Sequence, residues 1–409
     1  MGLSKDFSLF VASRLRENKG KNFSSLIARI AVGSIAIGIA VMILAFAIFA
    51  GFKHNIQEKI FSLASHIQAK KWVDSYSYEE IPVSTQLDLY QNAAEIPGVE
   101  HIQVYSRKAC ILKTDLEVSG AVMKGVGTDY DSARFNKNLI AGSFIDLDKK
   151  NYSTEIVVSN NIAKRLQLSL GDRLSVYFVQ DPPRVRRVTV KGIYETGIED
   201  FDDLIIIGDI RLIQRLNDWD STQVGGFEIF IDDFDQLDVV FENVWDAMDP
   251  ELGISKVTEM YMQFFDWFIM LNRNVVVVLV VILFVAGFNV ISVTLIMITE
   301  RTNMIGTLKA LGSSNGQIRK IFVYNGVRLI VKGLVLGNLL ALGFGFLQNQ
   351  FKLIPLDPSN YYMDAVPVMF DTSVILLTNL GFIALILLIL MIPTYIIARF
   401  QPIKAIRFS

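Results

Sequence analysis

The chain has 409 residues, 52% of them hydrophobic, and its mean hydropathy of +0.40 excludes an ordinary soluble protein of this size. The apolar residues concentrate in four runs and the middle of the chain has an ordinary composition, which predicts a membrane protein with one large aqueous domain. Between Phe52 and Arg273 lie 35 acidic and 23 basic residues, and the rest of the chain holds 6 acidic and 16 basic ones. The absence of a basic patch with interleaved aromatic residues argues against a nucleic-acid partner.

The sequence has no residue set with catalytic or metal-binding spacing. The single cysteine, Cys110, lies in an alternating apolar run and is predicted to be a buried thiol. The three histidines are widely separated, and Gly20-Lys21 lacks the rest of a phosphate-binding loop. Five acidic residues between Glu195 and Asp203 lack the spacing of a calcium loop, so a solvated acidic loop is favoured over a metal site. We therefore expect no catalytic residue, bound metal or cofactor in this chain.

The N-terminal part is predicted to hold an amphipathic helix at 1–23, on the cytoplasmic membrane surface, and the first span at 24–50. A signal peptide is the competing interpretation, but the apolar core starts too far along the chain and lacks a small-residue cleavage site. The basic residues before the core place the N-terminus in the cytoplasm.

The region 51–273 is predicted to lie outside the cytoplasm, as a helix followed by a large domain. Phe52, Ile56, Ile60 and Leu63 keep the helical period, so the first helix continues beyond the membrane. Alternating runs rich in β-branched residues predict strands at 66–73, 102–112, 121–126, 155–158, 174–179, 185–194, 204–207 and 227–231. Helices are predicted at 84–94, 160–168, 209–216 and 236–248, with Ser84 and Ser159 as N-caps. This mixture indicates an α+β domain with mixed sheets.

Two segments of this domain leave alternatives open. The hairpin between the runs 174–179 and 185–194 has a tip at Pro182, Pro183 and Arg184, which is either a tight connection or a docking tip for another protein. The stretch 260–273 is dense in methionine and aromatic residues, which suit either a membrane-interface belt or an adaptable surface for acyl chains.

The remaining chain is predicted to hold three spans. They lie at 274–299, 323–346 and 374–398, separated by a cytoplasmic segment at 300–322 and a periplasmic loop at 347–373, with a cytoplasmic tail at 399–409. Asn289 and Ser292 are predicted to form hydrogen bonds between helices. Small residues recur every four positions in the third span and predict a close helix-packing face: Gly333, Gly337, Ala341 and Gly345.

The cytoplasmic segment has several bases against one acid, Glu300, as expected for a short cytoplasmic loop. Met304, Ile305, Leu308 and Leu311 fall at helical spacing, with Gly312 as a C-cap, and predict a short amphipathic helix. Such a helix either lies on the membrane surface or packs against another protein.

The segment also resembles a known family. Its pattern is similar to the coupling segment of FtsX/MacB-type ABC transporter permeases at Ile305-Gly306, Leu308-Lys309-Ala310-Leu311-Gly312, Gln317-Ile318-Arg319 and Ile321-Phe322. Many members carry an acidic residue where this chain has Met304. Stretches at 51–60, 361–368 and 402–407 resemble the lipoprotein-releasing (LolC/LolE-like) branch of the family. The resemblance at 51–60 implies that the region 51–273 begins with a stalk that lifts the periplasmic domain off the membrane.

The resemblance implies four spans and a MacB-like periplasmic domain with an α/β lobe and a small β-rich lobe, the latter roughly between Val118 and Phe227. It implies a cytoplasmic ABC ATPase partner (LolD-like) that binds ATP and Mg, a second permease chain of the same or a sister type, lipoprotein substrates, and a periplasmic carrier (LolA-like) at the hairpin. The expected location is the cell inner membrane. The expected ATPase-coupling residues are Glu300, Arg301, Met304, Ile305, Leu308, Lys309, Leu311 and Gly312.

The implied function is extraction of lipoproteins from the membrane by mechanotransmission. We expect the acyl chains to be held between Met42, Phe46 and Phe49 of the first span and Phe264, Phe265 and Phe268 of a partner chain, from the position and size of these side chains. The alternatives are a MacB-like efflux permease and an FtsX-like signalling subunit that controls a periplasmic hydrolase. A membrane-anchored enzyme is disfavoured because no nucleophile and base occur together.

Overall fold

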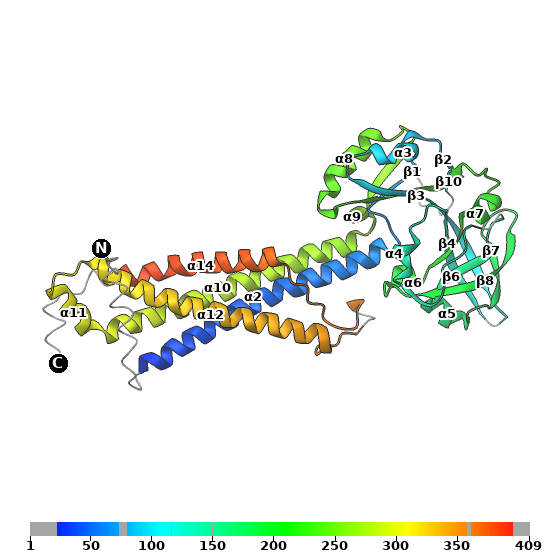
Figure 1. The fold of residues 1–409 in the computed structure, drawn as a ribbon. Coiled ribbons are helices and arrows are strands. Elements are labelled where there is room, and N and C mark those ends of the chain that lie inside the picture. Colours follow the sequence, from blue (N-terminus) through cyan, green and yellow to red (C-terminus); the bar gives the residue numbers. More distant parts are fainter. Residues whose placement is uncertain (1–22, 73–79, 116, 149–150, 358–360, 396–409) are drawn as a thin grey trace. The chain divides into compact units, whose positions relative to one another are not determined.

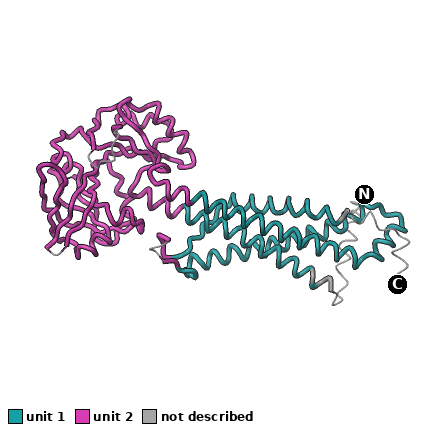
Figure 2. The backbone as a smooth tube through the Cα atoms, turned by 180° about the vertical axis from the view of Figure 1, so that it is seen from behind, with its two compact units in different colours: residues 1–53, 268–355, 365–409 teal, residues 54–267, 356–364 magenta. Residues whose placement is uncertain are grey.

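The computed structural model describes residues 23–72, 80–115, 117–148, 151–357 and 361–395. The predicted helix at 1–23 and tail at 399–409 therefore lie, but for Phe23, outside the described residues. The chain forms two compact units, and Figure 2 colours them separately. Unit 1 comprises residues 1–53, 268–355 and 365–409, and unit 2 comprises residues 54–267 and 356–364.

Unit 1 is helical. Its main helices, labelled in Figure 1, are α2 (Phe23–Phe61), α10 (Met262–Glu300), α12 (Asn315–Phe351) and α14 (Thr372–Tyr395). The last residues of α2 and the first of α10 belong to unit 2. All four are long and apolar enough to cross a membrane. The predicted continuation of the first helix beyond residue 50 is confirmed, since α2 runs without a break to Phe61. The third span differs from the prediction, because α12 begins at Asn315 and so includes the second half of the segment 300–322.

The core of unit 1 consists of aliphatic and aromatic side chains from these helices, including Ile39, Ile330, Phe382 and Ile386. Side-chain hydrogen bonds link the helices at two places. Asn289 Nδ2 donates to Ser34 Oγ at 2.9 Å, and Asn338 exchanges hydrogen bonds with Asn379 at 2.8 and 3.0 Å. Hydrogen bonds of this kind contribute to helix association in a bilayer.

Unit 2 is built on a ten-stranded mixed sheet. Its strands are β1 (Ile67–Lys71), β3 (Val99–Lys113), β4 (Val118–Val126), β5 (Leu139–Gly142), β6 (Glu155–Ser159), β7 (Arg173–Phe178), β8 (Arg184–Tyr194), β9 (Ile205–Asp209), β11 (Gly226–Ile231) and β12 (Leu252–Lys256). A separate two-stranded sheet pairs β2 (Val83–Ser84) with β10 (Gln223–Val224). The smaller helices are α3 (Asp88–Gln91), η1 (Ala93–Glu95), α4 (Ser132–Asn136), α5 (Asn160–Leu166), α6 (Glu199–Asp202), α7 (Ile210–Leu216), η2 (Phe234–Gln236), α8 (Leu237–Ala247) and α9 (Val257–Met260).

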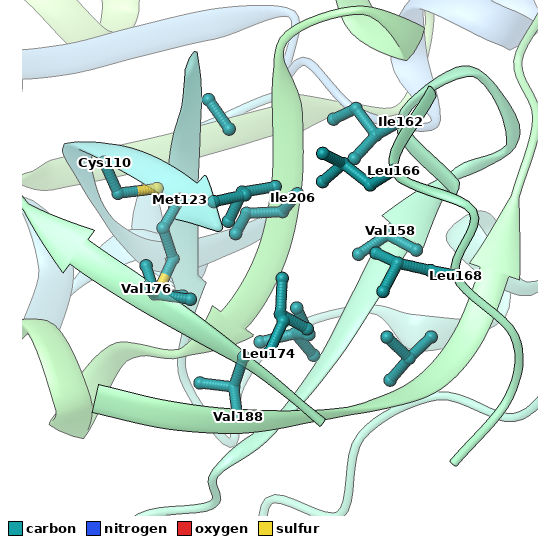
Figure 3. Close-up of a cluster of buried hydrophobic side chains, with 14 of the residues drawn as sticks. Cys110, Met123, Val158, Ile162, Leu166, Leu168, Leu174, Val176, Val188 and Ile206 are labelled. Atoms are coloured by element: carbon teal, nitrogen blue, oxygen red, sulfur yellow. The ribbon is translucent and has the colours of Figure 1, made fainter. Parts of the chain in front are cut away.

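Part of the sheet closes on itself. The pairings run β3–β4–β9–β6–β8–β7 and return from β7 to β3, which makes a closed ring of strands. The strands of this ring share one cluster of buried hydrophobic side chains with α5 and α7, and Cys110 belongs to it, as predicted (Figure 3). The other end of β3 joins β11, β1 and β12 in an antiparallel sheet.

The structure confirms the predicted strands to within a few residues. The predicted N-cap Ser159 is also confirmed, because its Oγ accepts a hydrogen bond from the Ile162 amide of α5 at 3.1 Å. The prediction at 84–94 is wrong: Ser84 pairs with Gln223 in a strand, and the helix shrinks to Asp88–Gln91 followed by a 3-10 turn. The β-rich part also begins earlier than Val118, because β3 supplies one wall of the ring.

Candidate functional site

The amphipathic helix predicted within residues 300–322 is α11 (Thr302–Ala310). Ile305 and Gly306 are buried, and Ile305 packs with Ile298 from the end of α10 and with Ile318 and Phe322 from the start of α12. Met304 and Leu308 pack against the same cluster. The apolar face of α11 is therefore covered by its own chain, and neither the membrane surface nor a partner is needed to bury it.

The turn after α11 is well defined. Gly312 has a φ of +91°, which favours glycine over other residues and ends the helix. Ser314 then caps α12: its Oγ accepts a hydrogen bond from the Gln317 amide, while Gln317 Oε1 accepts one from the Ser314 amide at 2.9 Å. These caps hold α11 at a fixed position at the end of α12.

The opposite face of α11 is open to solvent. Asn303, Thr307, Ala310 and Leu311 are exposed, and Leu311 is 77% exposed. Glu300 is also exposed, whereas Arg301 and Lys309 are half-buried. Asn303, Thr307 and Ala310 are not among the coupling residues predicted from the sequence, because that prediction followed the spacing of the apolar side chains. Their own spacing of three or four residues indicates that they share the opposite face of the helix. A large apolar side chain beside a polar helix face is typical of a protein-binding surface.

The small residues of α12 lie where a larger side chain would collide with a neighbour. A Cβ atom on Gly333 would lie 2.3 Å from Ile35 Cγ2, and one on Gly337 would lie 2.7 Å from the Ala36 carbonyl oxygen. Ala341 is fully buried, and a Cβ on Gly345 would meet the Phe370 ring at 2.3 Å. This face thus brings α12 close to α2.

Two of the expected acyl-contact residues line a cavity of about 250 Å³ in unit 1. Phe46 and Phe49 of α2 form one side, and the start of α14 with Met369 and Phe370 forms another. Lys53 and Asp371 also line it. Met42 lies in the buried core of the helices, so it does not present a surface to a second chain.

Phe264 and Phe265 belong to unit 2. Phe264 is buried, contacts the edge of the Tyr362 ring at a centroid distance of 5.7 Å, and lines a second cavity of about 680 Å³. Phe265 stacks on Phe234 at 5.9 Å. Phe268 is buried in α10.

The hairpin tip is tied to α7. Arg184 donates hydrogen bonds to both carboxylate oxygens of Asp218, at 3.1 and 2.7 Å, and to the Arg215 carbonyl at 2.9 Å. Pro182 and Pro183 remain exposed. Arg184 thus anchors the tip, and the two prolines form the surface available to a partner.

Comparison with known proteins gives concordant results. The profile of the MacB-like periplasmic core domain matches residues 30–242, and that of the FtsX-like permease C-terminal domain matches residues 276–402. The lipoprotein-releasing system transmembrane protein LolC of Neisseria meningitidis is 23% identical, covering 97% of both chains. LolE of Haemophilus influenzae, also named a lipoprotein-releasing system transmembrane protein, is 23% identical, covering 97% of this chain and 98% of LolE. The macrolide export ATP-binding/permease protein MacB 1/2 of Paracoccus denitrificans is 22% identical, covering 83% of this chain and 51% of that protein.

Proposed function

Because this chain belongs to the FtsX/MacB family of ABC transporter permeases, we propose that it is the membrane subunit of an ATP-driven system that releases lipoproteins from the inner membrane. The observation that carries the proposal is the similarity to LolC and LolE along 97% of the chain, with close to the full length of each relative covered. In this proposal the termini are cytoplasmic, the region 51–273 is periplasmic, and a partner ATPase binds ATP and Mg.

The exposed face of α11 is the proposed docking site for that ATPase. Asn303, Thr307 and Leu311 supply a polar and an apolar contact surface, and the covered face holds α11 against α12. Since α12 is one helix of 37 residues, a displacement of α11 moves the whole helix toward its outer end at Phe351. This continuity supports mechanotransmission without a hinge between the cytoplasmic segment and the third span.

The cavity lined by Phe46 and Phe49 is the proposed entry point for an acyl chain. Moving an acyl chain out of a bilayer costs about 0.8 kcal/mol per CH₂ group. The apolar wall of this cavity, with Phe46 and Phe49, would lower this cost, and ATP hydrolysis by the partner supplies the remaining free energy. Lipoproteins are then handed to a periplasmic carrier, for which Pro182 and Pro183 are the proposed contact.

The test is purification of the tagged full-length chain from its native membrane in mild detergent, followed by mass spectrometry of the proteins that accompany it. We expect an ABC ATPase, a second permease chain and acylated lipoproteins that dissociate when ATP is added. Replacing Leu311 with Asp should reduce the recovered ATPase about tenfold or more, because a buried carboxylate at an interface is unfavourable. Val118→Asp, at an exposed apolar side chain of unit 2, is the matched control and should leave ATPase recovery unchanged.

The outcomes separate the alternatives. Recovery of an ATPase with no lipoprotein, and with ATPase activity stimulated by small apolar compounds, would favour efflux, the function in the name of the MacB relative. Recovery of a peptidoglycan hydrolase would favour a signalling subunit. Absence of any ATPase from the wild-type preparation would contradict the permease proposal.

A further inference from the structure

Unit 2 holds a cavity of about 680 Å³ whose walls come from three chain segments that all belong to this unit. Its lining consists of four aromatic side chains, two carboxylates, one amide and one isoleucine. The first turns of α10 contribute Gln263, Phe264 and Trp267, the turn into α6 contributes Ile198, Glu199 and Asp200, and the segment 356–364 contributes Tyr361 and Tyr362. Aromatic rings and two carboxylates therefore surround one space within a single compact unit.

The wall with the two carboxylates is fixed by a buried neighbour. The Asp202 carboxylate accepts hydrogen bonds from the amides of Thr196, at 3.1 Å, and Gly197, at 2.7 Å. These bonds hold the turn that leads into α6 and so set the positions of Glu199 and Asp200. Asp202 is only 2% exposed and does not line the cavity, so its role is to support the wall.

The wall with the two tyrosines is also held in place. The Leu356 amide donates a hydrogen bond to the Asp364 carbonyl at 2.8 Å, which closes the base of this segment, and Lys59 Nζ donates one to the Tyr362 carbonyl. The rings of Tyr362 and Phe264 lie edge to face at a centroid distance of 5.7 Å. These contacts join the tyrosine wall to α10, so the cavity is formed before any ligand enters it.

The two carboxylates of the cavity have no cationic partner in the chain. Glu199 and Asp200 are exposed, and Asp200 accepts a hydrogen bond from the neutral Gln263 amide at 2.8 Å. Neither carboxylate forms an ion pair among the residues that the structure describes, and no described residue in the lining is basic. A cation that enters the cavity therefore displaces no partner of these groups.

Other acidic residues of the same stretch already have partners. Glu195 accepts a hydrogen bond from Asn160 Nδ2 at 2.9 Å, and Asp203 lies 3.2 Å from Arg165 Nη2. The sequence favoured one solvated acidic loop over this whole stretch. The structure instead divides it into acids that bond to the fold and two that line the cavity.

The chemistry of these walls selects an organic cation. The two carboxylates would repel an anion. Among the described residues, no group of three or more histidine, cysteine, aspartate or glutamate side chains could hold a metal ion. Aromatic rings attract guanidinium and ammonium groups, and carboxylates form charge-assisted hydrogen bonds with the same groups.

Arginine fits this cavity better than lysine does. A guanidinium group is planar, donates several hydrogen bonds in one plane, stacks on aromatic rings and is more weakly hydrated than an ammonium group. The cavity volume lies in the range that holds a ligand of many atoms, so neighbouring peptide groups have room beside the side chain. Because both carboxylates are exposed, a peptide can reach them from solvent.

We propose that the cavity binds the guanidinium group of an arginine side chain in a peptide segment of another protein. Glu199 and Asp200 are its counter-charges, and Trp267 and Tyr361 are aromatic walls beside it. The proposal requires only the folded unit 2 and does not depend on lipoprotein release.

The test compares peptides that differ only in one side chain. The full-length chain is purified in mild detergent and titrated by calorimetry with a blocked pentapeptide that carries one arginine between glycine and serine residues. We expect it to bind about tenfold more tightly than the same peptide with citrulline, which is neutral and nearly identical in shape. The lysine peptide should fall between the two. Methylguanidinium alone should bind more weakly than the arginine peptide, because it leaves most of the cavity unfilled.

The double variant Glu199→Gln/Asp200→Asn should bring the ratio of the arginine and citrulline affinities close to one. The control Glu242→Gln/Asp246→Asn removes the same charge from exposed positions on α8 and should keep the wild-type ratio. Trp267→Leu is a second cavity variant and should lower the ratio if the melting temperature shows that the first variant does not fold.

Equal affinities of the wild type for the arginine and citrulline peptides would overturn the proposal, and so would an unchanged ratio in a folded cavity variant. A lysine peptide that binds as tightly as the arginine peptide would overturn the choice of guanidinium. Methylguanidinium that binds as tightly as the arginine peptide would overturn the assignment to a peptide and indicate a small organic cation as the ligand.

Discussion

The two compact units bury different kinds of side chain. The core of unit 1 is apolar, and α12 approaches α2 through glycines whose replacement would cause collisions. Unit 2 buries an ion pair, in which Lys124 Nζ lies 2.7 Å from Glu228 Oε1 and the two side chains are 2% and 0% exposed. The backbone hydrogen bonds of a helix lie within the helix itself, so contacts between helices depend mainly on the sizes of the side chains at the interface. In unit 2 the Leu63 carbonyl, just beyond α2, and the Glu228 carboxylate on β11 are polar groups that need a buried partner. We therefore expect the stability of unit 2 to depend on buried charge, and that of unit 1 to depend on side-chain volume.

Removing the buried ammonium group of unit 2 should have the largest effect. Lys124 also donates a hydrogen bond to the Leu63 carbonyl, just beyond the stalk helix, at 2.6 Å, and Gln103 supports the other oxygen of Glu228 at 2.8 Å. Lys124→Met should lower the free energy of unfolding of unit 2 by about 3–5 kcal/mol, because Glu228 would remain buried without its partner. Denaturant unfolding of the full-length protein, followed by hydrogen exchange of unit 2, measures this.

Two further variants test whether the unpaired buried charge of Glu228 causes the loss of stability in Lys124→Met. The double variant Lys124→Met/Glu228→Leu should recover much of the loss, because no charge stays buried. Arg184→Met, which breaks the exposed ion pair with Asp218, should change the free energy of unfolding little. A loss as large for Arg184→Met as for Lys124→Met would remove the distinction between buried and surface charge.

Acid should destabilise unit 2 through His66. This side chain is buried, its Nδ1 accepts a hydrogen bond from the Ile231 amide at 2.9 Å, and burial lowers its pKa from 6.5 to about 4. Between pH 6.5 and pH 4 the unfolded chain binds a proton that the folded chain does not, so stability falls as the pH falls. The loss approaches roughly 3 kcal/mol near pH 4.

Urea unfolding at a series of pH values would measure the slope. His66→Asn offers an oxygen to the same amide without a titrating group, so its stability should depend less on pH in this window. A slope unchanged by His66→Asn would assign the acid sensitivity to another group.

Adding one methyl group should separate the two kinds of glycine in unit 1. Gly333→Ala should destabilise the helical unit by about 1–3 kcal/mol, because the new Cβ would lie within 2.3 Å of Ile35 and force the helices apart. Gly343→Ala on the same helix meets nothing within 4 Å and should be neutral or slightly stabilising. Melting temperatures of the two purified variants in one detergent would measure the difference. Equal melting temperatures would show that close approach of α12 to α2 does not limit stability.

Much of the fold could be predicted from the sequence because its signals are local. The four apolar helices follow from the length and hydropathy of single runs, and most strands follow from alternation over a few residues. Ser84 shows where local signals fail, since its cap-like sequence is overridden by pairing with Gln223 far along the chain. The amphipathic period at α11 was also predicted from the sequence, but not which of its faces would be covered.

By itself the sequence determined the number of apolar helices, the acidic domain between the first two, and the short helix after the second with its C-cap at Gly312. Only the tertiary structure decided that β3 closes a ring with β4 and β7, that Ile305 faces its own chain while Leu311 faces solvent, and that α6, α10 and the loop at Tyr362 enclose one cavity. The physical reason is the range of the interactions. Hydropathy and helical period act between neighbours in the chain, whereas strand closure and cavity walls depend on segments that meet only when the whole chain has folded.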